Sequence, residues 1–338
     1  MKRRDFLKAA TVGAGATAAA FSDGAHALMR EPLQMPPQAV GMLYDSTLCI
    51  GCKACMVACK QANDVPVEHA AMDDLMYDTP LDLSGSTFNV IKAYRDGNME
   101  QKDREVNGYA FMKRHCLHCV DPSCISACPV SAMEKDALTG IVRHYPDRCI
   151  GCRYCVAGCP FGVPKYQYND AFGEIAKCQF CSHLQAKGQI PACCDVCPTG
   201  ASLFGSMDDI MAEAKRRLEA KPGDTYVFPR GKLGEDRPPH EASIPEYQNN
   251  LYGDKELGGT QVVYLSGVPF DKLGLPTDVP EYGYPAITEG IQHTLYQWFA
   301  LPFILFAGLT FAVRKNTSQE HKEEHTSGKS ETAGEDAS

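Results

Sequence analysis

The sequence lacks the short motifs that mark several common enzyme classes. It has no P-loop, no glycine-rich dinucleotide fingerprint and no G-x-S-x-G nucleophile elbow, which argues against nucleotide-dependent and serine-hydrolase chemistry. No stripe of clustered Lys and Arg is present and the formal net charge is -9, so no nucleic-acid partner is expected. No pair of residues stands out as a general acid and base. We therefore expect no catalytic site in the chain itself.

Cysteine, by contrast, is abundant. The 338 residues include 17 cysteines, and 16 of them fall into four short groups. Grouping of this kind indicates metal ligation or a disulfide framework. Groups one to four, in chain order, are Cys49, Cys52, Cys55 and Cys59; Cys116, Cys119, Cys124 and Cys128; Cys149, Cys152, Cys155 and Cys159; and Cys178, Cys181, Cys193 and Cys197.

The spacing within the groups is that of ferredoxins. Groups one and three share C-x2-C-x2-C-x3-C, every group ends in x3-C, and three groups are followed directly by proline. Three thiolates on one tight loop fit three corners of a [4Fe-4S] cluster, and the fourth cysteine reaches the other cluster of a pair. A four-cysteine zinc site is the competing interpretation, but three cysteines within seven residues suit one tetrahedral ion poorly. Disulfides are the poorest alternative because 17 is an odd number.

The repeat of group one in group three predicts an internal symmetry. Groups two and three lie close together, over residues 116–159, like one complete ferredoxin. Groups one and four, residues 49–59 and 178–197, flank them and would form a second, interrupted unit. The sequence therefore predicts an α+β fold with two nested ferredoxin-like [4Fe-4S] pairs and strand insertions.

The N-terminus resembles a twin-arginine export signal. Arg3 and Arg4 precede a mild apolar stretch, and the small-x-small triplet Ala25-His26-Ala27 is the expected cleavage site, so residues 1–27 would be removed. A short amphipathic helix is the alternative. Because this route carries folded proteins, clusters inserted in the cytoplasm could be exported with the chain.

The C-terminal region predicts a membrane anchor. Residues 291–313 contain no Asp, Glu, Lys or Arg, and the run ends at Arg314 and Lys315. About 20 helical residues span the ~30 Å hydrocarbon core, so one transmembrane helix over 291–315 is expected; the alternative is a buried core helix. The basic flank places the C-terminus in the cytoplasm, and residues 316–338 are expected to be disordered.

The remainder resembles a known family through phrases such as "GMLYDSTLCIGC", "NGYAFMKRHCLHCVDPSC", "CPVSAMEKDALTGIV", "LYGDKELGGTQVVYLSGVP" and "IQHTLYQ". The chain is similar to the four-cluster iron-sulfur subunits of membrane-bound oxidoreductases. It most resembles those of periplasmic nickel-iron hydrogenases of the hydrogenase 2 type. The resemblance implies electron transfer through four [4Fe-4S] clusters from hydrogenase small and large subunits to an integral membrane quinone-reactive subunit. The alternative is the equivalent subunit of a formate dehydrogenase or another molybdenum or tungsten oxidoreductase.

The same resemblance implies which cysteines share a cluster. The implied sets are Cys49, Cys52, Cys55 and Cys197 for cluster 1; Cys59, Cys178, Cys181 and Cys193 for cluster 2; Cys116, Cys119, Cys124 and Cys159 for cluster 3; and Cys128, Cys149, Cys152 and Cys155 for cluster 4. Cys194 is then a spare, buried thiol. His115 and His118 are expected to pack on cluster sulfur or to hydrogen-bond to it.

Residues outside the cysteine groups predict a scaffold. We expect a four-cluster domain over residues 28–205 and a helix with an extended partner-binding segment over 206–290. The helix should begin at Met207 with Ser206 as its N-cap and end near Ala220. Strands are expected in "STFNVIKAY", "GYAFMKR" and "TQVVYLSGV" because their side chains alternate between apolar and polar.

Overall fold

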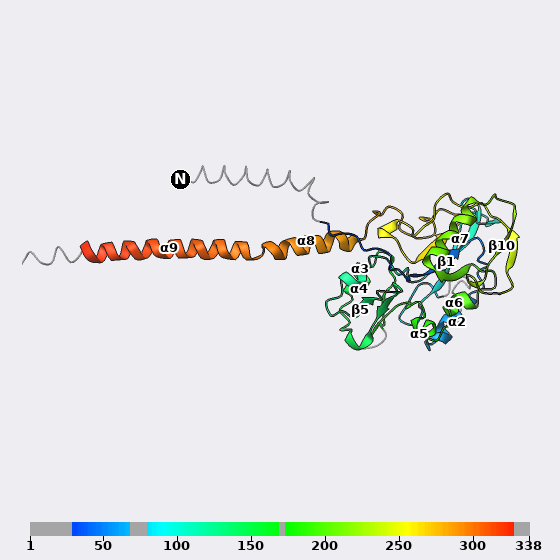
Figure 1. Cartoon of the computed structure of the whole chain (residues 1–338), viewed down its shortest axis with the longest axis horizontal. Helices are drawn as coiled ribbons and strands as arrows, with labels where there is room; N and C mark the ends of the chain where they lie inside the picture. The colour runs from blue at the N-terminus through cyan, green and yellow to red at the C-terminus, as the bar shows by residue number, and fades with distance from the viewer. Residues whose placement is uncertain (1–28, 68–79, 169–172, 328–338) are drawn as a thin grey trace, which may run out of the picture. The chain divides into compact units, whose positions relative to one another are not determined.

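The computed structural model describes residues 29–67, 80–168 and 173–327 (Figure 1). The predicted export signal lies outside the described residues. Residues 31–286 form one compact unit, the body, and the chain from Ile287 onward belongs to a second unit. Within the body, the segment after residue 205 shares a sheet with the segment before it.

A four-stranded sheet organises the body, in the order β11-β9-β1-β13. β1 (Val40–Asp45) pairs antiparallel with β9 (Ser202–Ser206) and parallel with β13 (Val262–Leu265), with Met42 opposite Val262. β11 (Gly231–Lys232) extends the sheet beside β9. Strands from both ends of the body are therefore neighbours in one sheet.

The two faces of this sheet pack against different layers. Leu43, Leu203 and Val263 pack against helix α7 (Met207–Glu219). The residues next to them in each strand point the opposite way, because strand side chains alternate, and join a core that also contains cysteines. The sheet thus separates α7 from the cysteine-bearing layer.

The expected helix and strands are confirmed. α7 begins at Met207, and the Ser206 side chain accepts a hydrogen bond from the Asp209 backbone N–H at 3.2 Å, as an N-cap should. The three expected strands correspond to β2 (Val90–Arg95), β4 (Gly108–Arg114) and β13.

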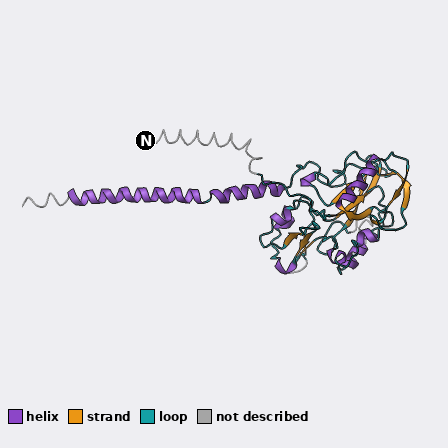
Figure 2. Cartoon of the chain, in the orientation of Figure 1, coloured by secondary structure: helices purple, strands orange, loops and turns teal. Residues whose placement is uncertain are grey.

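The other elements of the body are short, and Figure 2 shows long loops between them. A three-stranded sheet has the order β2-β4-β3, and three two-stranded ladders are β5-β6, β7-β8 and β10-β12. Their bounds are β3 (Gln101–Lys102), β5 (Met133–Lys135), β6 (Val142–His144), β7 (Lys165–Tyr166), β8 (Ile175–Ala176), β10 (Thr225–Phe228), β12 (His240–Ser243), η3 (Pro146–Arg148), η4 (Glu256–Gly258), α2 (Ala54–Ala62), α3 (Ser123–Ser126), α4 (Tyr154–Gly158), α5 (Ser182–Gln185) and α6 (Ala192–Asp195).

Two helices, α8 (Tyr284–Trp298) and α9 (Ala300–Ser327), end the described chain. Within the described residues, the stretch Tyr284–Phe311 is long and apolar enough to cross a membrane. It begins seven residues earlier than the span expected from residue 291. Disorder was expected from residue 316, but α9 continues to Ser327 because Gln, Glu and Lys in this stretch favour helix.

Candidate iron-sulfur cluster sites

All 17 cysteines lie in the described part of the chain, and none forms a disulfide bond. Eight are buried, eight are half-buried and Cys52 is exposed. Among the described residues, no three His, Cys, Asp or Glu side chains stand close enough to hold a single metal ion. The described chain therefore contains no preformed site for one tetrahedral zinc ion.

The first candidate site lies on the loop between β1 and α2. Gly51 and Lys53 have positive φ values of 70° and 59°, which turn the backbone tightly around the cysteines. A Cβ on Gly51 would lie 2.6 Å from the Phe111 ring, so a larger residue would also clash. A cavity beside this loop is lined by four of the cysteines, which we call the first site: Cys49, Cys52, Cys55 and Cys197.

The second candidate site lies where α2 packs against α6. Cys59, on the last turn of α2, interacts electrostatically with Cys193 and Cys181. The three cysteines that precede it in group one, Cys49, Cys52 and Cys55, line the cavity of the first site. A separate cavity is lined by the cysteines that we call the second site: Cys59, Cys178, Cys181 and Cys193.

The inner groups exchange their last cysteines in the same way. α3 packs against α4, and Cys119 interacts with Cys159 as well as with Cys116 and Cys124. Cys155 interacts in turn with Cys128 and with the other two cysteines of its own loop. We call Cys116, Cys119, Cys124 and Cys159 the third site, and Cys128, Cys149, Cys152 and Cys155 the fourth site.

The four sites follow one another in a row. Cys55 of the first site interacts with Cys193 of the second. Cys178 of the second site interacts with Cys116 of the third, and Cys124 of the third with Cys155 of the fourth. These cross-site interactions give the order first, second, third, fourth.

Several of the candidate ligand thiols are held in surroundings that oppose their ionisation, whereas hydrogen bonding from Cys194 lowers the pKa of Cys193. Burial, the main cause, raises the pKa of Cys59 and Cys124 from 9.0 to about 12, and that of Cys155 and Cys181 to about 11. Neighbouring cysteines raise these pKa values further, since two thiolates repel each other. Bound cations would overcome this penalty, and four soft thiolates form the donor set that [4Fe-4S] clusters take. The residues present therefore fit such clusters.

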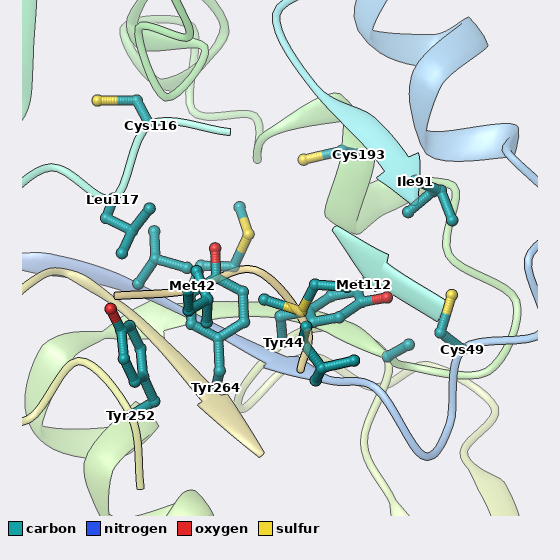
Figure 3. Close-up of a cluster of buried hydrophobic side chains, with 14 of the residues drawn as sticks. Met42, Tyr44, Cys49, Ile91, Met112, Cys116, Leu117, Cys193, Tyr252 and Tyr264 are labelled. Carbon is teal, nitrogen blue, oxygen red and sulfur yellow. The ribbon is translucent and has the colours of Figure 1, made fainter. Parts of the chain in front are cut away.

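Aromatic and thioether side chains fill the space between the sites (Figure 3). The Tyr44 and Tyr264 rings are 5.8 Å apart, and the Tyr252 ring lies 6.1 Å from that of Tyr264. All three rings are buried. The Tyr44 hydroxyl donates to the Phe111 carbonyl at 2.8 Å and also lies in hydrogen-bonding contact with Cys49. This packing keeps water away from the inner sides of the sites.

Two buried histidines differ in what their free nitrogen can do. His118 Nδ1 accepts a hydrogen bond from the Val142 N–H at 3.0 Å, so its Nε2 carries the proton and has no partner among the described residues. His115 Nδ1 lies 2.8 Å from the Cys116 carbonyl oxygen and must donate to it, which leaves Nε2 as an acceptor. Burial lowers the pKa of both imidazoles. His118 therefore has an unused donor at Nε2 among the described residues, whereas neutral His115 has only an acceptor there.

Sequence reasoning missed three lysines beside the sites. Lys113, Lys135 and Lys177 are buried or half-buried and interact electrostatically with candidate ligand cysteines. Lys135 Nζ donates to the Cys119 carbonyl at 2.8 Å, and Lys177 Nζ donates to the Cys178 carbonyl at 3.0 Å. Their nearness to the cysteine motifs was the one available signal.

Comparison with known proteins agrees with this chemistry. Residues 107–207 match the family model described as "4Fe-4S dicluster domain". The chain is 46% identical to the Hydrogenase-2 operon protein HybA of Escherichia coli O157:H7 over 326 residues, which cover 95% of this chain and 97% of that protein. It is 34% identical to the formate dehydrogenase-O iron-sulfur subunit of Escherichia coli K12 over 276 residues, 81% of each chain. A formate dehydrogenase iron-sulfur subunit of Haemophilus influenzae is 35% identical over 243 residues, 71% of this chain and 69% of that subunit.

Proposed function

The chain belongs to the family of ferredoxin-type iron-sulfur electron-transfer subunits that includes HybA and the formate dehydrogenase iron-sulfur subunits, and we propose that it is the relay subunit of a periplasmic hydrogenase. In this role it passes electrons from hydrogen oxidation at a nickel-iron site in the hydrogenase small and large subunits to a quinone-reactive membrane subunit. The higher identity to HybA, over nearly the full length of both chains, favours hydrogenase as the partner.

The observation that carries the proposal is the row of four cysteine sites. Each site offers four thiols, and sites that adjoin along the row interact electrostatically. Both ends of the row approach solvent: Cys52 of the first site is exposed, and Ile150 beside the fourth site is 65% exposed. A row that is buried in the middle and accessible at both ends suits one-electron transfer between two partner proteins.

We assign one [4Fe-4S] cluster to each of the first, second, third and fourth sites. When bound, each cluster supplies a one-electron couple whose potential depends on charge, hydrogen bonds and burial. The chain's own residues set these conditions. The cysteine thiolates hold the iron, Tyr44 and Tyr264 exclude water, and the His118 Nε2–H is placed to donate a hydrogen bond.

The domain boundaries follow from the same proposal. Residues 1–27 are a twin-arginine signal, 28–205 form the cluster domain, and 206–290 carry α7 and a partner-binding segment. The body lies on the periplasmic side of the inner membrane. Residues 291–315 anchor it in the lipid, and residues 316–338 lie in the cytoplasm.

A formate dehydrogenase type of complex is the second candidate, because two such subunits are 34% and 35% identical to this chain. Metal content of the native complex separates the two. The tagged full chain is purified from gently solubilised membranes, and iron, nickel, molybdenum, tungsten and zinc are counted. About sixteen irons per chain, four for each of four clusters, with co-purified nickel support the hydrogenase relay. Molybdenum or tungsten without nickel supports the alternative, and zinc in place of iron refutes both.

A further inference from the structure

Lys113 is a fully buried lysine on β4, between two cluster sites. Its side chain has no solvent exposure. Nζ donates to Ser202 Oγ at 3.1 Å and lies 3.6 Å from Met42 Sδ, and the ammonium also interacts electrostatically with the Cys193 sulfur. Ser202 lines the cavity of the first site and Met42 lines that of the second, so the ammonium lies between the two cavities.

The electrostatic reach of Lys113 includes both sites of the outer pair. On the first site it interacts with Cys55, for which it is the largest influence after burial. On the second site it interacts with Cys59, Cys181 and Cys193. No other buried ammonium described above interacts with ligands of both sites.

The charge of Lys113 has no carboxylate partner within ion-pair distance in the described ranges 29–67, 80–168 and 173–327. An ammonium removed from water without a counter-charge is strongly unfavourable. The groups that interact with it are cysteine sulfurs: Cys193 of the second site, Cys55 of the first site, and the neighbouring Cys194. Its counter-charge is therefore the pair of sites itself.

We propose that Lys113 is a counter-cation shared by the first and second clusters and that it raises the reduction potentials of both. A [4Fe-4S] cluster with four thiolates is anionic, and reduction adds a further negative charge. A fixed ammonium in a low-dielectric core stabilises the reduced form more than the oxidised form. The inference rests on the proposed function, because it requires clusters at both sites.

Lys135 provides the matched control. It is also a lysine close to cysteines, but those it interacts with are Cys116, Cys119 and Cys124, all of the third site. Removing its charge should therefore change one potential, and that of a different cluster. If the deletion of any lysine from the body had the same general effect, the two variants would shift the same reduction potentials.

The test is a potentiometric titration of the anaerobically purified, detergent-solubilised full chain, followed by electron paramagnetic resonance. The variants are Lys113→Met, Lys113→Arg and Lys135→Met, each with its iron content measured. Loss of one step in Cys52→Ala and in Cys59→Ala assigns the first-site and second-site reductions. We expect Lys113→Met to keep its iron and to shift these two steps together to lower potential. Lys113→Arg should stay near wild type, and Lys135→Met should shift the third-site step alone.

Three results would overturn the assignment of Lys113. The first is an iron-loaded Lys113→Met protein with unmoved first and second steps, and the second is an equal shift of all four steps. The third is loss of iron from both Lys113→Met and Lys113→Arg, which would make the residue necessary for assembly and not for tuning. A wild-type chain without four reduction steps would instead contradict the proposed function, so the two failures can be told apart.

Discussion

Removal of Cys59 tests how the chain shares its ligands between clusters. Cys59 follows Cys55 by four residues, yet it interacts with Cys181 and Cys193, which lie more than 120 positions later in the sequence. Shared ligation therefore predicts that Cys59→Ala empties the second site and leaves the first intact. Iron should fall from about sixteen to about twelve per chain, because one of four four-iron clusters is lost.

Two double variants make the prediction specific. If Cys59 and Cys181 hold the same cluster, Cys59→Ala with Cys181→Ala should still retain about twelve irons, whereas Cys59→Ala with Cys52→Ala should retain about eight. Ligation by each sequence group separately predicts the reverse. Cys194→Ala is the control: it removes the buried cysteine next to Cys193, which is not a proposed ligand, and should keep about sixteen irons.

The assay is iron and acid-labile sulfide per chain, measured on anaerobically purified protein with electron paramagnetic resonance of the reduced sample. Alanine is used because serine oxygen can replace a thiolate as ligand. About eight irons in the variant lacking Cys59 and Cys181, with about twelve in the variant lacking Cys59 and Cys52, would refute the shared arrangement.

Three further predictions follow from the body. Gly51→Ala should lose first-site iron because its Cβ would lie 2.6 Å from a ring of β4. Gly151 has a similar φ of 68°, but a Cβ there would lie 3.5 Å from its nearest neighbour, so Gly151→Ala should retain fourth-site iron. Equal losses of iron in the two variants would contradict this reasoning. Arg217→Met removes the buried ion-pair partner of Asp45 and leaves Glu213 paired with Arg216 alone, so it should lower the free energy of unfolding by about 3–5 kcal/mol in urea titrations. Arg216→Met, which removes a guanidinium that is 62% exposed, should lower it by only about 0–1 kcal/mol. Burial lowers the pKa of His144 from 6.5 to about 4, so the unfolded chain binds a proton at this residue before the folded chain does. The stability that the neutral imidazole contributes is therefore fully present above pH 6.5 and is lost as the pH falls towards 4. At pH 5 the loss should reach about 1–2 kcal/mol, and the fall in stability should shrink in His144→Gln; an unchanged pH dependence would contradict it.

The cysteine framework could be predicted because its spacing is local. Three of the four groups span only 11 to 13 residues each (49–59, 116–128 and 149–159), and the N-cap hydrogen bond of Ser206 joins residues three positions apart. Helix α2 packs against α6 and α3 against α4, while the nesting of two cluster pairs that the repeat suggested stays a prediction. In these features, residues that are close in the sequence determine the local structure.

Features that depend on distant residues were not predictable. The parallel pairing of β1 with β13 joins residues about 220 positions apart, and no local pattern announces it. Lys113 was missed for a related reason. In an alternating strand a lysine is expected to face solvent, but here the outer pair of sites covers that face of β4. The extension of α9 to Ser327 was missed because the apolar pattern ends before the helix does.

The pairing of β1 with β13 also sets the order of events during synthesis. β1 leads directly into the loop of the first site, but its parallel neighbour is made only after nearly the whole body has left the ribosome. Long-range pairing of this kind delays the final packing of a domain. An export signal at residues 1–27 would emerge long before that packing is possible. If residues 1–27 are a signal for a route that accepts only folded proteins, we expect export to wait until strand 262–265 has paired with β1.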